Sequence, residues 1–122
     1  MPFHKLDVYR KAYDVSLRIH KETTAFPSFE QHELASQLRR SSKSICANIA
    51  EGMGRQMSPK DVIRFLRTAL GSCDETRIWL EYSRDLGYID AGKFVDLHEA
   101  YCEVGRMVNG LVQSWMRRES GA

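Results

Sequence analysis

Apolar residues recur along most of the chain at intervals of three and four, which is the spacing of amphipathic helices. No segment shows the sustained alternation of apolar and polar residues that is typical of a β-strand. We therefore predict four helices, over about 6–22, from Ser28 to Gly52 or Gly54, over about 59–86, and over about 91–116.

One stripe of each predicted helix is expected to face the core. In the first helix the stripe is Leu6, Tyr9, Tyr13, Leu17 and His20. In the second it is Leu34, Leu38, Ile45 and Ile49. The third helix has Val62, Leu66, Ala69, Cys73, Thr76 and Leu80. The fourth has Phe94, Leu97, Tyr101, Val104, Val108, Leu111 and Trp115, whose regular spacing is typical of a left-handed helix bundle.

Local signals mark the ends of these helices. Ser28 begins a capping-box spacing, and Ser58 fits an N-cap because a proline and then an acidic residue follow it. Gly87 suits the left-handed position after the third helix, and Asp90 suits the cap of the fourth. The last residues, 117–122, are expected to fray. Long helices joined by short loops are antiparallel neighbours, so the fold class is an all-α, up-down-up-down four-helix bundle forming one domain over residues 1–122.

The second predicted helix is unusual because many of its residues are small. The stretch QLRRSSKSICANIAEGMGR, residues 37–55, combines serine and alanine with several cations. The glycines that end it are interpreted as a C-terminal cap rather than a nucleotide loop, because a dinucleotide motif opens a helix. The outward side is either a solvated face or a contact between identical subunits. Its candidate interface residues are Ser36, Arg40, Ala47, Ala50 and Glu51.

Charge is unevenly distributed, although the whole chain carries a net charge of only +2. Residues 38–67 hold seven basic and two acidic side chains, a net charge of +5, whereas residues 68–116 hold four basic and eight acidic ones, a net charge of −4. This basic segment is either a solvated face balanced by neighbours or a surface that binds phosphate. The candidate nucleic-acid-binding residues are Arg39, Arg40, Lys43, Arg55, Lys60, Arg64 and Arg67.

Catalysis is poorly supported, and we predict no catalytic residues, no metal site, no cofactor and no small-molecule substrate. The four histidines form neither the His-Glu-x-x-His pattern nor a Glu-x-x-His pair, and His20 and His98 are expected to pack against the core. The three cysteines are far apart in sequence and are interpreted as buried residues of a reducing cytoplasm. No apolar run approaches the length of a membrane span, so no membrane partner is expected.

Several segments together resemble a known family. KLDVYRKAYDVSLRIHKET, FPSFEQHELASQLRRSSKSICANIAEGMGR and RFLRTALGSCDET resemble the bacterial four-helix bundle proteins encoded within intervening sequences of 23S ribosomal RNA genes. The resemblance implies the up-down bundle and a ring-shaped homopentamer. A related branch, the accessory protein of diversity-generating retroelements, is a basic barrel that works with a reverse transcriptase and RNA.

The leading hypothesis is a non-enzymatic cytoplasmic homo-oligomer that binds structured RNA or DNA through a basic surface repeated around a ring. The alternatives are a scaffold for other proteins and a regulatory subunit without a nucleic-acid role.

Overall fold

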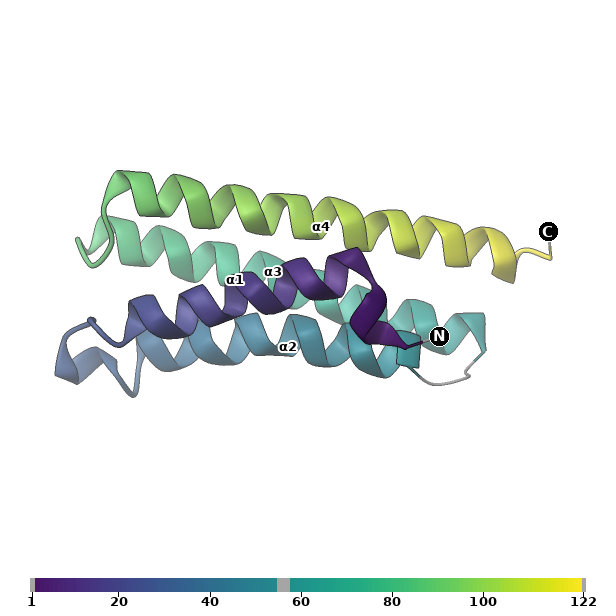
Figure 1. The fold of residues 1–122 in the computed structure, drawn as a ribbon, viewed down its shortest axis with the longest axis horizontal. Coiled ribbons are helices and arrows are strands. Elements are labelled where there is room, and N and C mark those ends of the chain that lie inside the picture. The colour runs from purple at the N-terminus through teal and green to yellow at the C-terminus, as the bar shows by residue number, and fades with distance from the viewer. Residues whose placement is uncertain (1, 55–57, 122) are drawn as a thin grey trace.

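A computed structural model describes residues 2–54 and 58–121 of the chain. Four long helices make up the described fold: α1 (Asp7–Thr23), α2 (Leu34–Gly54), α3 (Pro59–Asp85) and α4 (Ala91–Glu119). Two short 3-10 helices, η1 (Phe3–Lys5) and η2 (Ser28–Glu30), precede α1 and α2. The described residues contain no strand. The predicted all-α class is confirmed, and Figure 1 shows successive helices running in opposite directions.

The helices are arranged as a square in chain order. Among the described residues, α2 packs against α3, α3 packs against α4, and α1 contacts both α2 and α4. Two ion pairs join α1 to α4: Lys11 Nζ lies 2.9 Å from Glu103, and Lys93 Nζ lies 3.1 Å from Glu22. Helix α1 is therefore diagonally opposite α3. Both ends of the described chain lie at the same end of the bundle as the last turn of α2 and the first turn of α3 (Figure 1).

The core stripes of α2 and α3 are those that the sequence predicts, and every member of both stripes is buried. On α4, Leu97, Tyr101, Val104 and Val108 are buried as predicted. Val112 is buried as well, whereas Leu111 and Trp115 are partly buried at the edge of the core. Helix α4 continues to Glu119, so the prediction that the residues from 117 onward fray is wrong for Arg117, Arg118 and Glu119.

The predicted core stripe of the first helix is confirmed only for Leu6 and Tyr9, which are partly buried against the core, and is wrong for its other three members. Tyr13 and Leu17 are 46% and 53% exposed, and His20 is exposed as well. The stripe that faces the core is Val8, Ala12, Val15 and Ile19. Both stripes have helical spacing, and they differ by a rotation of roughly one residue, or about 100°. The aliphatic stripe faces inward because tyrosine and histidine keep a polar tip that water can solvate.

Three of the predicted helix boundaries are confirmed. Ser58 is the N-cap of α3, and its Oγ accepts a hydrogen bond from the backbone nitrogen of Asp61 at 3.3 Å. Asp90 caps α4 in the same way through the backbone nitrogen of Lys93 at 2.8 Å. Gly87 has a φ of +82° after α3, in the left-handed region that favours glycine.

The predicted start of α2 is wrong. Ser28 begins the 3-10 helix η2 and not α2, and no side-chain cap precedes η2. Gln31 instead points back towards α1, where its Nε2 donates to the carbonyl oxygens of Thr23 at 2.9 Å and Phe26 at 3.0 Å. These bonds close the α1–α2 connection, and regular helix begins only at Leu34.

The glycines near the end of α2 do not act as left-handed caps. Gly52 and Gly54 both lie within α2, and neither has a positive φ. A Cβ added at Gly52 would lie 3.0 Å from Cβ of Phe65, and one added at Gly54 would lie 3.0 Å from a ring carbon of Phe3. The predicted end of the helix at Gly54 is confirmed, but its left-handed cap is wrong. The glycines instead allow α3 and η1 to approach α2 closely.

Candidate nucleic-acid interface

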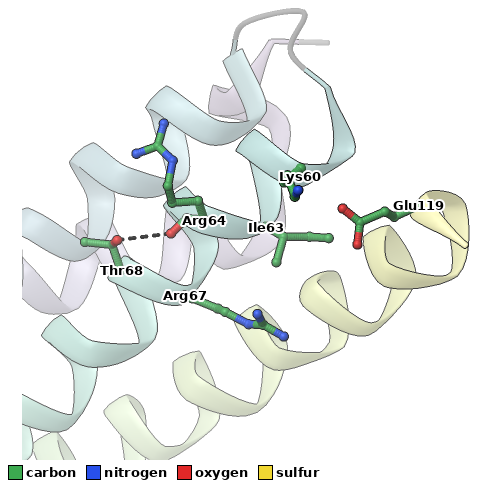
Figure 2. A pocket seen from close by; sticks show the side chains of 6 residues that line it. All are labelled: Lys60, Ile63, Arg64, Arg67, Thr68 and Glu119. Carbon is green, nitrogen blue, oxygen red and sulfur yellow. Dashed lines mark hydrogen bonds between the residues drawn. The ribbon is translucent and has the colours of Figure 1, made fainter.

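The first part of α3 carries three of the cations that the sequence singled out. Lys60, Arg64 and Arg67 lie about one turn apart, because they are spaced by four and three residues along the helix. They line a groove of about 510 Å³ between α3 and the end of α4. The other lining residues shown in Figure 2 are Ile63, Thr68 and Glu119. The three predicted residues therefore lie along one groove, but Figure 2 shows the guanidinium of Arg67 directed towards α4 and that of Arg64 directed away from it.

The two guanidinium groups of this groove have weak partners. Arg64 lies 3.7 Å from the Asp61 carboxylate, but its side chain is 65% exposed, so solvent screens the pair. Its Cζ also lies 4.5 Å from the ring centroid of Phe65. Arg67 extends towards α4, where its Nη2 donates to Met116 Sδ at 3.5 Å (Figure 2). Thioether sulfur is a weak acceptor, so both guanidinium groups keep most of their capacity to bind an anion.

Glu119 lowers the positive charge of the groove, because its carboxylate lies there too (Figure 2). A carboxylate repels phosphate and attracts the nearby cations. The groove can still accept an anion, since its lining holds three cations and one carboxylate. Its net charge is therefore positive.

Arg39 has a different role, which the sequence analysis missed. Its Nε donates to Thr23 Oγ1 at 2.8 Å, and its Nη2 donates to Gln31 Oε1 at 2.7 Å. The side chain is half-buried and connects the end of α1, the α1–α2 connection and α2. These contacts lie at the end of the bundle opposite the groove (Figure 1). The sequence gave no signal for these bonds, because the half-buried Gln31 and the buried Thr23 reach Arg39 only after the chain turns back.

Arg40 and Lys43 are exposed and are also remote from the groove. Lys43 Nζ lies 3.1 Å from His20 Nδ1, which accepts the hydrogen bond. Hydrogen bonds from Thr76 to Ser41, at 2.8 Å, and between Ser44 and Ser72, at 2.9 Å, place this part of α2 beside the middle of α3. The predicted phosphate ligands thus occupy two separate places. Arg55 lies outside the described residues.

The serines of α2 have a function within the subunit. Ser41 accepts from Thr76, Ser44 meets Ser72, and Asn48 Nδ2 donates to Ser44 Oγ at 3.1 Å and to the Ser44 carbonyl at 2.8 Å. Because these side chains are short, they allow α2 and α3 to pack closely while their polar groups stay paired. Part of the small-residue composition of residues 37–55 is explained by this contact.

The outward side of α2 holds the predicted interface residues. Arg40 and Ala47 are exposed, while Ser36, Ala50 and Glu51 are half-buried. Their helical positions lie away from the buried stripe of α2, so they form a low surface with few large side chains. A contact with a second copy remains a prediction for these five residues.

The cysteines and histidines do not gather into a metal site in the described residues, where no group of three or more ligating side chains is suitably placed. Cys73 is buried, and its Sγ donates to the Tyr101 carbonyl at 3.1 Å. Burial raises the pKa of Cys73 to about 11, so this thiol is protonated at neutral pH. His98 is half-buried beside Phe94 and Cys102, whereas the prediction that His20 packs in the core is wrong. Within residues 2–54 and 58–121, no helix has the length and apolar character that a bilayer crossing requires.

These observations define a four-helix bundle protein with a basic groove near the end that holds its termini. A family model described as 23S rRNA-intervening sequence protein matches residues 4–110. The chain therefore belongs to this family, which confirms the resemblance seen in its sequence.

A solved structure supports the same assignment. It is a protein of unknown function from the S23 ribosomal protein family of Bacteroides thetaiotaomicron, and it is 26% identical to this chain. The match has a TM-score of 0.80 and covers 93% of this chain and 99% of the other. No match was found among the curated proteins.

Proposed function

We propose that the protein binds the phosphate backbone of structured RNA through the groove formed by Lys60, Arg64 and Arg67. The observation that carries this proposal is that all three residues line one groove at the start of α3, where both guanidinium groups have weak partners. Arginine offers phosphate a planar fork of donors, and lysine offers a compact charge. The family description concerns 23S rRNA, so structured RNA is the first polyanion to test.

Binding of this kind is sequence-independent, because the groove presents cations rather than groups arranged to read base edges. Its affinity should depend steeply on salt, since each phosphate neutralised by a cation releases condensed counterions. A single groove with three cations gives weak binding. Repetition of the groove around a ring would add the fields of several copies and strengthen the attraction.

We also propose that identical copies assemble through the outward side of α2. The exposed Ala47 lies at the centre of this low surface, between Arg40 and Glu51. Small side chains let a second helix approach closely, and the two charged residues could form ion pairs across the contact. Closed rotational symmetry would then place every basic groove on the same rim.

The decisive experiment measures binding of a fluorescein-labelled RNA hairpin by anisotropy at several salt concentrations. We expect Arg64→Glu with Arg67→Glu to abolish most of the binding, because the change places acids where phosphate would sit. Lys21→Glu with Arg106→Glu is the matched control, since both residues are exposed and the total change in charge is the same. Equal losses in the two variants, or affinity that does not change with salt, would refute the groove.

Light scattering of the purified protein tests the assembly separately. We expect a mass of several subunits for the native chain and a single subunit for Ala47→Glu, which would bury an unpaired charge. A native protein that is monomeric would refute the ring. Recovery of one partner protein and no nucleic acid from cells would instead favour the scaffold alternative.

A further inference from the structure

A second surface, formed by η1 and α1, carries a series of neighbouring aromatic rings. The ring centroids of Phe3 and His4 are 3.9 Å apart, those of Phe3 and Tyr9 are 5.0 Å apart, and those of Tyr9 and Tyr13 are 6.0 Å apart. Tyr13 ends this series and is 46% exposed. The series therefore presents an aromatic ring to solvent next to half-buried ones.

These rings border a hollow of about 460 Å³ on the surface of α1. Its lining residues are His4, Tyr9, Arg10, Tyr13 and Asp14. The hollow thus combines aromatic faces with one guanidinium and one carboxylate. It is separate from the basic groove, because α1 is diagonally opposite α3 in the bundle.

The hollow is supported by its surroundings. The helix η1 carries His4 and is closed by a hydrogen bond from the backbone nitrogen of Leu6 to the Phe3 carbonyl at 3.0 Å. The ring of Phe3 lies against Gly54, where an added Cβ would come within 3.0 Å of it. Tyr9 and Phe3 therefore hold the aromatic series between α1 and the end of α2 before any ligand binds.

We infer that this hollow binds the base of an unpaired nucleotide. A base is flat and stacks on tyrosine whatever its sequence, while Arg10 can contact the phosphate of the same nucleotide. Asp14 can accept hydrogen bonds from the N–H groups on a base edge. Guanine suits such a carboxylate, because its Watson–Crick edge has two neighbouring N–H donors. A purely apolar partner would leave Arg10 and Asp14 without a role.

This inference rests on the proposed function, since it specifies unpaired nucleotides in the RNA that the protein binds. Structured RNA contains such nucleotides in its loops and bulges, and proteins recognise them by stacking. The groove on α3 would contact the backbone, and the hollow on α1 would hold an extruded base. Binding of a single nucleotide to the hollow does not require the groove, so the two proposals can be tested apart.

Titration with guanosine monophosphate, followed by calorimetry and by amide shifts of residues in α1, tests the hollow. We expect Tyr13→Leu to weaken binding about tenfold, since stacking on one aromatic ring makes a contribution of this size. Tyr82→Leu is the matched control, because Tyr82 is 54% exposed on α3, and it should bind as the native chain does. Arg10→Gln should weaken guanosine monophosphate more than guanosine, which lacks the phosphate.

Each outcome separates the two proposals. If the Arg64→Glu, Arg67→Glu variant loses the hairpin but keeps guanosine monophosphate, both proposals are supported. If the native chain binds the hairpin but not the nucleotide, or if Tyr13→Leu binds the nucleotide normally, the inference is refuted. If Tyr13→Leu changes the mass of the assembly without changing nucleotide binding, the hollow is a contact between copies and the inference again fails. Nucleotide binding without hairpin binding would refute the groove instead.

Discussion

The two ends of the bundle use their charged residues in opposite ways. At the end with the α1–α2 and α3–α4 connections, Arg39 bonds to Thr23 and Gln31, and the Tyr88 hydroxyl donates to Glu30 at 2.8 Å. At the end with the chain termini, Lys60, Arg64 and Arg67 line an open groove. A count of charges along the sequence treats these cations alike. The comparison shows that a charge is available to a ligand only where the fold leaves its donors unused.

Loss of a cation should lower the stability of the protein more at the end with the α1–α2 and α3–α4 connections than at the end with the termini. We expect Arg39→Met to lower the free energy of unfolding by about 2–3 kcal/mol, because hydrogen bonds from a charged donor stabilise more than neutral ones and their acceptors would be left unpaired. Arg106→Met, at an exposed arginine of α4 outside the proposed subunit contact, is the control and should change stability by less than about 0.5 kcal/mol. Urea unfolding measures both. Equal effects of the two variants would remove the distinction between the ends.

The end of the bundle that holds the chain termini should be closely packed beneath its exposed cations. Gly52→Ala is expected to lower the free energy of unfolding by about 1–2 kcal/mol, because the new Cβ would crowd Phe65 by more than the gain in helix propensity offsets. Gly71→Ala, with nothing within 4 Å of the new Cβ, should instead raise it by about 0.5–1 kcal/mol. Thermal unfolding distinguishes the signs. If Gly52→Ala were also stabilising, the close approach of α2 and α3 would be excluded.

The salt dependence of hairpin binding should differ between the two sets of cations. We expect Lys60→Ala with Arg67→Ala to reduce the slope of log affinity against log salt by roughly 1.5–2, since two phosphate contacts are lost. Arg40→Ala with Lys43→Ala should leave most of the slope in place, provided that light scattering shows the same mass. A larger reduction of the slope in the second variant would show that phosphate binds on α2 rather than on α3.

The smallest expected effect concerns Glu119. Replacement by Gln removes the carboxylate from the groove. The hairpin affinity should then rise about twofold at low salt, an effect of the size expected for one partly screened charge. The same substitution should not change binding of guanosine monophosphate to α1. Anisotropy titration measures the first effect and calorimetry the second. A loss of affinity would show that Glu119 orients the cations rather than opposing the ligand.

The sequence predicted those parts of the fold that depend on local chemistry. Ser58, Gly87 and Asp90 were located correctly because caps and left-handed positions favour particular residues. The similar signal at Ser28 was wrong because Gln31 bonds back to the end of the first helix. The inward face of α1 was not located correctly. Tyr13 and Val15 belong to two different stripes of the helix, and both stripes have helical spacing. Which stripe is buried depends on the helices that pack beside it.

The candidate interface was predictable to a similar extent. The grouping of Lys60, Arg64 and Arg67 follows from their spacing on one helix. The bonds of Arg39 do not, because Gln31 reaches it only after the chain turns back at the α1–α2 connection. The exposure of Tyr13 was also missed, because its stripe was expected to face the core. Nucleic-acid binding, oligomer formation and the ligand of the hollow remain predictions.

The position of the termini has a practical consequence for anyone handling the protein. Both ends of the described chain lie at the end of the bundle that carries the cationic groove (Figure 1). A purification handle or fluorescent reporter genetically joined to either terminus would sit where a polyanion must approach, and a polyhistidine extension would add titratable positive charge there. Labels are better attached through an engineered cysteine near Gly87, at the far end, after the native thiols have been replaced.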